Sequence, residues 1–185
     1  MPITVRPIEP PPPPPPPKAW TAQRIARLAL TLLLARWGWV RYHDWPNAND
    51  SILHAIILPI HETGHIVFMA FGRYLYAAGG SLFQLIFPGI FVGYFLWKKQ
   101  RYSATVPLWF VGVSAVDLVG YIKDAPYGEM ELIGGEHDWS YLLGETRWMH
   151  AANQIGDFVL HFGGFCMLVA VVLGVWWAGE RPAEG

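Results

Sequence analysis

The residues best suited to chemistry form a His-Glu-x-x-His motif, made of His61, Glu62 and His65, inside an otherwise apolar stretch. On a helix both imidazoles project from one face, at a spacing that suits two ligands of a tetrahedral zinc ion, Zn²⁺. Glu62 lies about 100° round the helix from His61, where its carboxylate reaches a water molecule beside the metal rather than the metal itself. The motif therefore predicts two zinc ligands and a catalytic general base, as a zinc hydrolase needs.

The apolar surroundings of the motif strengthen this prediction. Two histidines and a glutamate are costly inside an apolar helix unless they face a cavity, pair with one another or bind a ligand. The alternative is a pair of hydrogen-bonded core histidines beside an incidental glutamate. We favour the functional interpretation, because ionisable residues within a membrane segment generally mark a site.

A catalytic zinc site needs a third protein ligand and one open position. Asp138 and His137 are the first candidates, because the flexible pair Gly134–Gly135 precedes them and several ligand-type groups follow one another there. We predict Asp138 as the ligand. The alternative is that this segment is an exposed acidic loop with a stray histidine.

Two other groups of residues remain candidates for the third ligand. Asp157 and His161 lie four residues apart in the last apolar run, with Asn153 one turn earlier. A polar stripe on an apolar helix is expected to face the bundle interior, where it can bind metal or orient the other ligands from behind. Asp117 is the single acid of another apolar run, and is either a ligand or the partner of a buried cation.

The composition is that of a membrane protein. Of the 185 residues, 53% are hydrophobic and only 15% are charged, and ten are tryptophan. The formal net charge of −1 gives no reason to expect a nucleic-acid partner. Cys166 is the single cysteine, which excludes an intrachain disulfide and a CxxC zinc site.

Apolar runs of helical length organise the chain. They cover about residues 20–40, 51–71, 85–97, 104–122 and 151–177. We therefore predict an all-α integral membrane protein, a bundle of about four to five transmembrane helices embedded in the lipid bilayer. Its single membrane domain covers residues 20–178, between a disordered proline-rich tail at 1–19 and a short polar tail at 179–185. The run Pro10–Pro17 is a stiff tether or a ligand for a partner protein.

Two of these runs are less regular. Residues 20–40 carry three arginines, so this helix either lies on the membrane surface, which we prefer, or spans with both ends anchored. Glycines and the Pro88-Gly89 pair interrupt residues 77–90, where we predict a loop or a partly re-entrant entry. Gln84 within it either binds a substrate backbone or caps a helix. Asp50 or Ser51 is predicted to cap the motif helix.

The segment His61–His65 reads His-Glu-Thr-Gly-His and resembles the His-Glu-x-Gly-His signature of the site-2-protease-like intramembrane zinc metallopeptidases. The resemblance implies an all-helical enzyme that cleaves membrane-protein or peptide substrates at or within the bilayer, and it suggests a bacterial plasma membrane. It also implies that His61 and His65 bind zinc and that Glu62 activates water.

In that family the third zinc ligand is the aspartate of an Asp-Gly motif on a later transmembrane helix. This chain contains no Asp-Gly pair, since Asp117 is followed by leucine and Asp157 by phenylalanine. The third ligand therefore stays open among Asp138, His137, Asp157 and Asp117.

Two alternatives to a peptidase follow from the same residues. One is a haem-binding or redox membrane protein, in which histidines of the apolar helices supply axial ligands. Its candidate ligands are His54, His61, His65 and His161. The other is a catalytically incomplete metal-binding membrane protein, which the missing Asp-Gly motif suggests.

Overall fold

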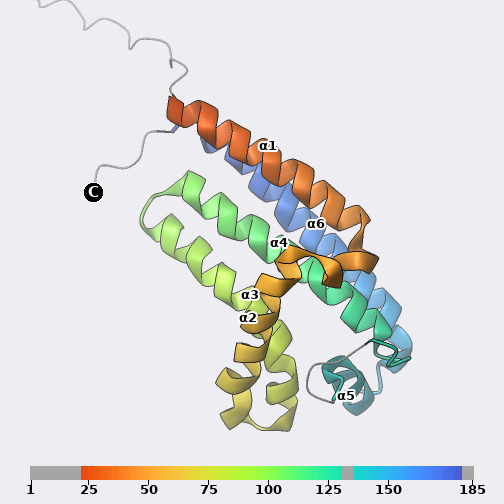
Figure 1. Cartoon of the computed structure of the whole chain (residues 1–185). Helices are drawn as coiled ribbons and strands as arrows, with labels where there is room; N and C mark the ends of the chain where they lie inside the picture. Colours follow the sequence, from red (N-terminus) through yellow and green to blue (C-terminus); the bar gives the residue numbers. More distant parts are fainter. Residues whose placement is uncertain (1–21, 131–135, 181–185) are drawn as a thin grey trace, which may run out of the picture.

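The computed structural model describes residues 22–130 and 136–180, which form helices and turns without a strand among them. The predicted all-α class and helical bundle are confirmed (Figure 1). The proline-rich tail at 1–19 and residues 181–185 lie outside the described residues. The elements in order are α1 (Ala22–His43), η1 (Trp45–Asp50), α2 (Ile52–Phe68), η2 (Met69–Phe71), α3 (Arg73–Trp97), α4 (Arg101–Asp124), α5 (Asp138–Glu145), η3 (Met149–Ala151) and α6 (Ala152–Trp177).

Four helical segments are long and apolar enough to cross a membrane. They are Ile52–Phe71, Arg73–Trp97, Arg101–Asp124 and Met149–Trp177. In the most apolar window of Arg101–Asp124, 61% of the residues are buried, against 28–33% for the other three segments. α4 is therefore the central helix, and the outer helices present large apolar side chains such as Ile66, Phe91 and Phe165 to their surroundings.

The contact between α4 and α6 is the tightest helix pair of the core. A Cβ built on Gly112 of α4 would lie 2.6 Å from the carbonyl oxygen of Gly163, and a Cβ on Gly163 would lie 2.6 Å from that of Gly112. The two backbones thus touch where neither residue has a side chain. The apolar core forms around this contact, and its buried members are Leu53, Ile57, Trp109, Val113, Val116, Val119, Leu160, Met167 and Ala170.

α1 lies antiparallel along α6 (Figure 1). At its start, the Arg27 guanidinium donates to the carbonyl oxygen of Glu180, 2.7 Å away, just beyond the end of α6. At its end, the Tyr42 hydroxyl pairs with His161 Nδ1 at 2.9 Å. α1 is not among the described segments that are long and apolar enough to cross a membrane. The surface position that we prefer from the sequence stays a prediction.

α3 is one helix from Arg73 to Trp97, so the predicted loop or re-entrant break at residues 77–90 is wrong. Glycines at this point admit a neighbouring helix: a Cβ on Gly64 of α2 would lie 2.3 Å from the carbonyl oxygen of Gly79. Pro88 removes one backbone hydrogen bond and leaves the rest of the helix intact. The first half of α3 lies beside α2 and its second half beside α4 (Figure 1).

The α4–α6 contact predicts a difference between two glycines of one helix. Gly112→Ala is expected to lower the free energy of unfolding by about 1–3 kcal/mol, because the new methyl group overpacks the contact with Gly163. Gly120→Ala meets nothing within 4 Å and is expected to be neutral or to stabilise by up to about 1 kcal/mol through helix propensity. Unfolding by SDS in mixed micelles, followed by circular dichroism, measures both. An equal loss in the two variants would contradict this account of the packing.

Candidate metal centre

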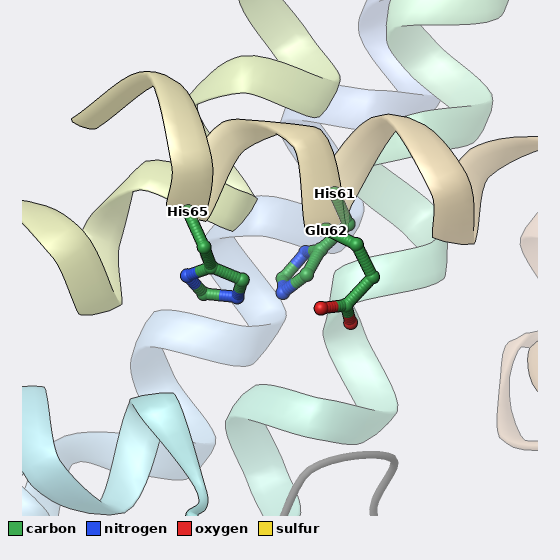
Figure 2. Close-up of side chains that lie close together, drawn as sticks. All are labelled: His61, Glu62 and His65. Carbon is green, nitrogen blue, oxygen red and sulfur yellow. The ribbon is translucent and has the colours of Figure 1, made fainter. Parts of the chain in front are cut away.

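α2 presents the motif from one side of the helix. Ser51 caps α2, as predicted, by accepting a hydrogen bond from the backbone N–H of His54 at 3.2 Å. Figure 2 shows the side chains of His61, Glu62 and His65 projecting together from the same side of α2. One ligand-type atom from each lies within 4.8 Å of the others, and the two histidines are buried. This His-Glu-His group is therefore able to hold a metal ion.

Hydrogen bonds fix the orientation of both imidazole rings. The amide nitrogen of Gln84 donates to the carbonyl oxygen of Ser114 at 2.8 Å, so its amide oxygen faces His61 Nδ1, 2.7 Å away, and must accept. His65 Nδ1 in turn donates to the carbonyl oxygen of Tyr76 at 2.8 Å. With the protons on Nδ1, each Nε2 carries a free lone pair. That is the tautomer a metal ligand requires.

The role of Gln84 differs from both sequence-based interpretations. It does not cap a helix. Although it lines the cavity, it is 1% exposed and both ends of its amide are bonded within the protein, so it has no free group for a substrate. Gly80 lies one turn earlier on α3, where a Cβ would come within 2.3 Å of His61 Nε2. Gly80 and Gln84 lie four residues apart, on one face of an apolar helix. This spacing is the feature of the sequence from which a buried polar neighbour of α3 could have been predicted.

Asp138 lies against both imidazoles. Its Oδ2 atom is 3.3 Å from Nε2 of His61 and 3.3 Å from Nε2 of His65. Burial raises the pKa of the Asp138 carboxyl, but the hydrogen bonds that His61 and His65 donate when their Nε2 atoms are protonated outweigh burial and lower it to about 2. The carboxylate is therefore ionised at neutral pH, as metal binding requires.

Contacts from α3 and α4 hold the start of α5, and Asp138 with it, in place. Tyr121 of α4 accepts the backbone N–H of Asp138 at 2.9 Å and donates its hydroxyl to Oδ2 at 3.3 Å. Trp139 Nε1 donates to the Ser81 hydroxyl of α3 at 3.1 Å. The Ser140 hydroxyl donates to the carbonyl oxygen at the end of α4 at 2.6 Å. The alternative of an exposed acidic loop is wrong for Asp138, which is 9% exposed. The preceding Gly134–Gly135 lies outside the described residues.

His137 is buried beside the site but faces away from it. Its Nδ1 accepts the backbone N–H of Ser140 and so caps α5, and its Nε2 lies 3.3 Å from Asp124. Its ring stacks on Tyr121 with centroids 4.2 Å apart. Burial lowers the pKa of His137, so the ring is neutral. His137 supports the position of Asp138 rather than joining the two motif histidines.

The remaining candidate ligands are paired with other residues than the two motif histidines. Asp117 is hydrogen-bonded to His54, whose Nδ1 lies 3.1 Å from each carboxylate oxygen. Asp157 pairs with Lys123, and His161 with Tyr42.

The polar stripe of α6 does not face the bundle interior, which corrects the prediction made from its spacing. Asn153, Asp157 and His161 are all exposed. The face of α6 turned toward α4 instead carries Gly156 and Gly163, together with larger apolar residues. Small residues allow closer backbone contact than polar side chains, and they therefore occupy the interior.

The motif side chains line a cavity of about 420 Å³ between α2, α3, α4 and α5. The cavity contains the candidate general base, Glu62, and the carboxylate of Asp138. Its lining residues are His54, Leu58, His61, Glu62, His65, Arg73, Tyr76, Ala77, Gln84, Asp117, Leu118, Tyr121, Met130, Glu136, Asp138 and Tyr141.

Comparisons of the chain with protein-family models, with curated proteins and with solved structures find no match.

The space above Gly80 predicts a specific loss of metal binding. Gly80→Ala is expected to weaken zinc binding by at least tenfold, because its methyl group would displace the His61 ring from its position. Gly89→Ala, in the same helix, meets nothing within 4 Å and is expected to bind zinc like the wild type. Competition with a chromogenic chelator measures both affinities. Equal affinities would show that the His61 ring does not depend on this gap.

The bond between Gln84 and His61 predicts a second effect. Gln84→Leu leaves Nδ1 of His61 without its acceptor and is expected to weaken zinc binding about 10–100-fold. Gln100→Leu makes the same change at an exposed position and serves as the matched control. The chelator competition applies again, and an unchanged affinity for Gln84→Leu would mean that the ring is oriented without this bond.

Proposed function

We propose that the chain is a membrane-embedded zinc metallopeptidase. In this proposal His61, His65 and Asp138 hold the metal, and Glu62 is the general base. The observation that carries the proposal is the convergence of one Asp138 oxygen on the Nε2 atoms of both histidines.

The two distances that join Asp138 Oδ2 to the histidine nitrogens also fit ligands that share a metal. Tetrahedral ligands about 2.0–2.1 Å from zinc lie about 3.3–3.4 Å from one another. The two nitrogen–oxygen distances are 3.3 Å each. Charge-assisted hydrogen bonds between an imidazolium and a carboxylate are shorter, about 2.7–2.9 Å. The spacing therefore fits two edges of a zinc tetrahedron.

The electrostatics of the cluster also favour a cation at its centre. When both rings are neutral, each donates its Nδ1 proton to an acceptor behind it and turns its Nε2 lone pair toward the Asp138 carboxylate. Three electron-rich atoms repel one another unless a cation lies among them. Two imidazoles and one carboxylate suit zinc, and three protein ligands leave one coordination position open.

Glu62 is placed to act on a water molecule in the cavity. Bound zinc would supply Lewis-acid chemistry, lowering the pKa of water and polarising a carbonyl group. The Glu62 carboxylate lines the cavity beside the two histidines. It accepts the proton of the attacking water and then delivers it to the leaving nitrogen of the peptide bond.

The alternatives have less support from the geometry. A haem with two histidine ligands needs them on its opposite faces, whereas His61 and His65 project from one face of one helix. His54 lies about 10 Å along α2 from His61, and His161 pairs with Tyr42 outside the cavity. The incomplete-site alternative rested on the missing Asp-Gly motif, and Asp138 offers a carboxylate by another route.

The membrane setting is part of the proposal. Four candidate spans support a membrane protein, and the family resemblance leads us to propose a bacterial plasma membrane. The proposed substrates are membrane proteins or peptides cleaved at or within the bilayer.

Metal analysis and hydrolysis assays on the detergent-purified full chain test the proposal. Wild type and Glu62→Gln are expected to hold about one zinc ion per chain, and His61→Ala and Asp138→Asn to lose most of it. Hydrolysis of an internally quenched peptide should fall by about 10²–10⁴-fold in Glu62→Gln. Asp157→Asn, which alters a carboxylate outside the cavity, is the control and should keep both properties.

Several outcomes would contradict parts of the proposal. Wild type that takes up no zinc would reject the metal site. Zinc bound by Asp138→Asn at wild-type affinity would reject Asp138 as a ligand. Zinc without hydrolysis of any peptide would reject the peptidase.

A further inference from the structure

The cavity extends along α2 well beyond the metal group. Five residues of α2 line it, at helical spacings of one to four positions: His54, Leu58, His61, Glu62 and His65. The rise per residue puts His54 about 10 Å along the axis from His61 and about 16 Å from His65. The proposed zinc ligands thus occupy one half of the cavity, and the other half leads to His54.

A second titratable pair closes that far end. His54 Nδ1 lies 3.1 Å from both carboxylate oxygens of Asp117 on α4. Asp117 is 9% exposed, while the His54 side chain keeps 25% of its surface accessible. In the neutral ring Nδ1 donates to Asp117, and Nε2, which then carries a lone pair, is the ring nitrogen left for a ligand. A bond that served only to join α2 to α4 would not require both residues to line the cavity.

We propose that His54, oriented by Asp117, is a substrate-binding subsite that accepts a backbone N–H of an extended peptide. This inference rests on the proposed peptidase function. An extended chain advances about 3.3 Å per residue, so the 10 Å between His54 and His61 corresponds to about three residues from the scissile bond. Apolar groups such as Leu58 and Leu118 line the path between, where an unpaired N–H is costly.

The subsite also selects the conformation of the substrate. In a helix each interior N–H is already bonded to a carbonyl oxygen one turn away, so a helical substrate has no N–H to offer His54. An unwound segment offers one at every residue. His54 therefore favours the extended form, in which the scissile carbonyl is also accessible to attack.

Peptide hydroxamates of one to five residues test the subsite in the purified full chain loaded with zinc. The hydroxamate binds the metal and so fixes the register of the peptide. Two series are made, one with the hydroxamate at the N-terminal end of the peptide and one with it at the C-terminal end. In one series the affinity is expected to rise about 5–10-fold when the third residue is added, as one hydrogen bond allows. His54→Ala and Asp117→Asn should lose this step and still bind the one-residue hydroxamate and zinc like wild type.

Methylation of the peptide nitrogen at the third residue supplies a test that needs no variant. It removes the hydrogen-bond donor, so it should abolish the rise in affinity at the third residue in wild type. The affinity of His54→Ala for the same peptide should not change. His161→Ala, which removes a histidine bonded to Tyr42 outside this cavity, is the matched control and should keep the step.

The outcomes separate the subsite from the enzyme activity. A step that persists in His54→Ala, or that survives N-methylation in wild type, overturns the subsite. Loss of affinity at every length in His54→Ala assigns the pair a purely structural role, and also overturns it. A length-dependent step in a protein that hydrolyses no peptide supports the subsite and rejects the proposed function instead.

Discussion

The close crossing of α2 and α3 is the constraint on which the site depends. The backbones meet at Gly64 and Gly79, where a Cβ on either residue would lie less than 3 Å from the opposite carbonyl oxygen. Only at this separation does the ring of His61 fit over Gly80 and its Nδ1 reach Gln84. Any larger residue at the crossing would move the histidines away from the groups that set their protonation. The site is thus positioned by the absence of side chains.

α4 organises the other half of the site. Ser114, Asp117 and Tyr121 follow one another at helical spacing, and they contact Gln84, His54 and Asp138 in turn. The opposite face of α4 carries Gly112 and Val116, which pack against Gly163 of α6. One buried helix therefore joins the apolar core to Gln84, His54 and Asp138. The cost of burying these three side chains is offset because each has a hydrogen-bond partner.

The sequence predicts the parts of this structure that depend on local spacing. The apolar runs and the Ser51 cap follow from periodicity and composition, and so does the common face of His61 and His65. The neighbours of a residue across the bundle do not follow from periodicity. Gly79 and Gly80 therefore resemble a helix break when α2 is not known to lie against them. The polar stripe of α6 resembles an interior face when the smaller residues beside it are not known to meet α4.

The carboxylate of Asp138 comes from a short helix, 77 positions along the chain from His61. A metal held by Asp138 together with α2 would act as a cross-link between two segments that otherwise meet directly through Asp138 and the two histidines. Because such a metal binds the folded state alone, its binding free energy adds to the stability of the protein. Depletion of the metal would loosen α5 before the apolar core. The site would then lose Asp138 while the bundle remained folded. The concentration of available metal would therefore determine what fraction of the molecules has all three ligands in place.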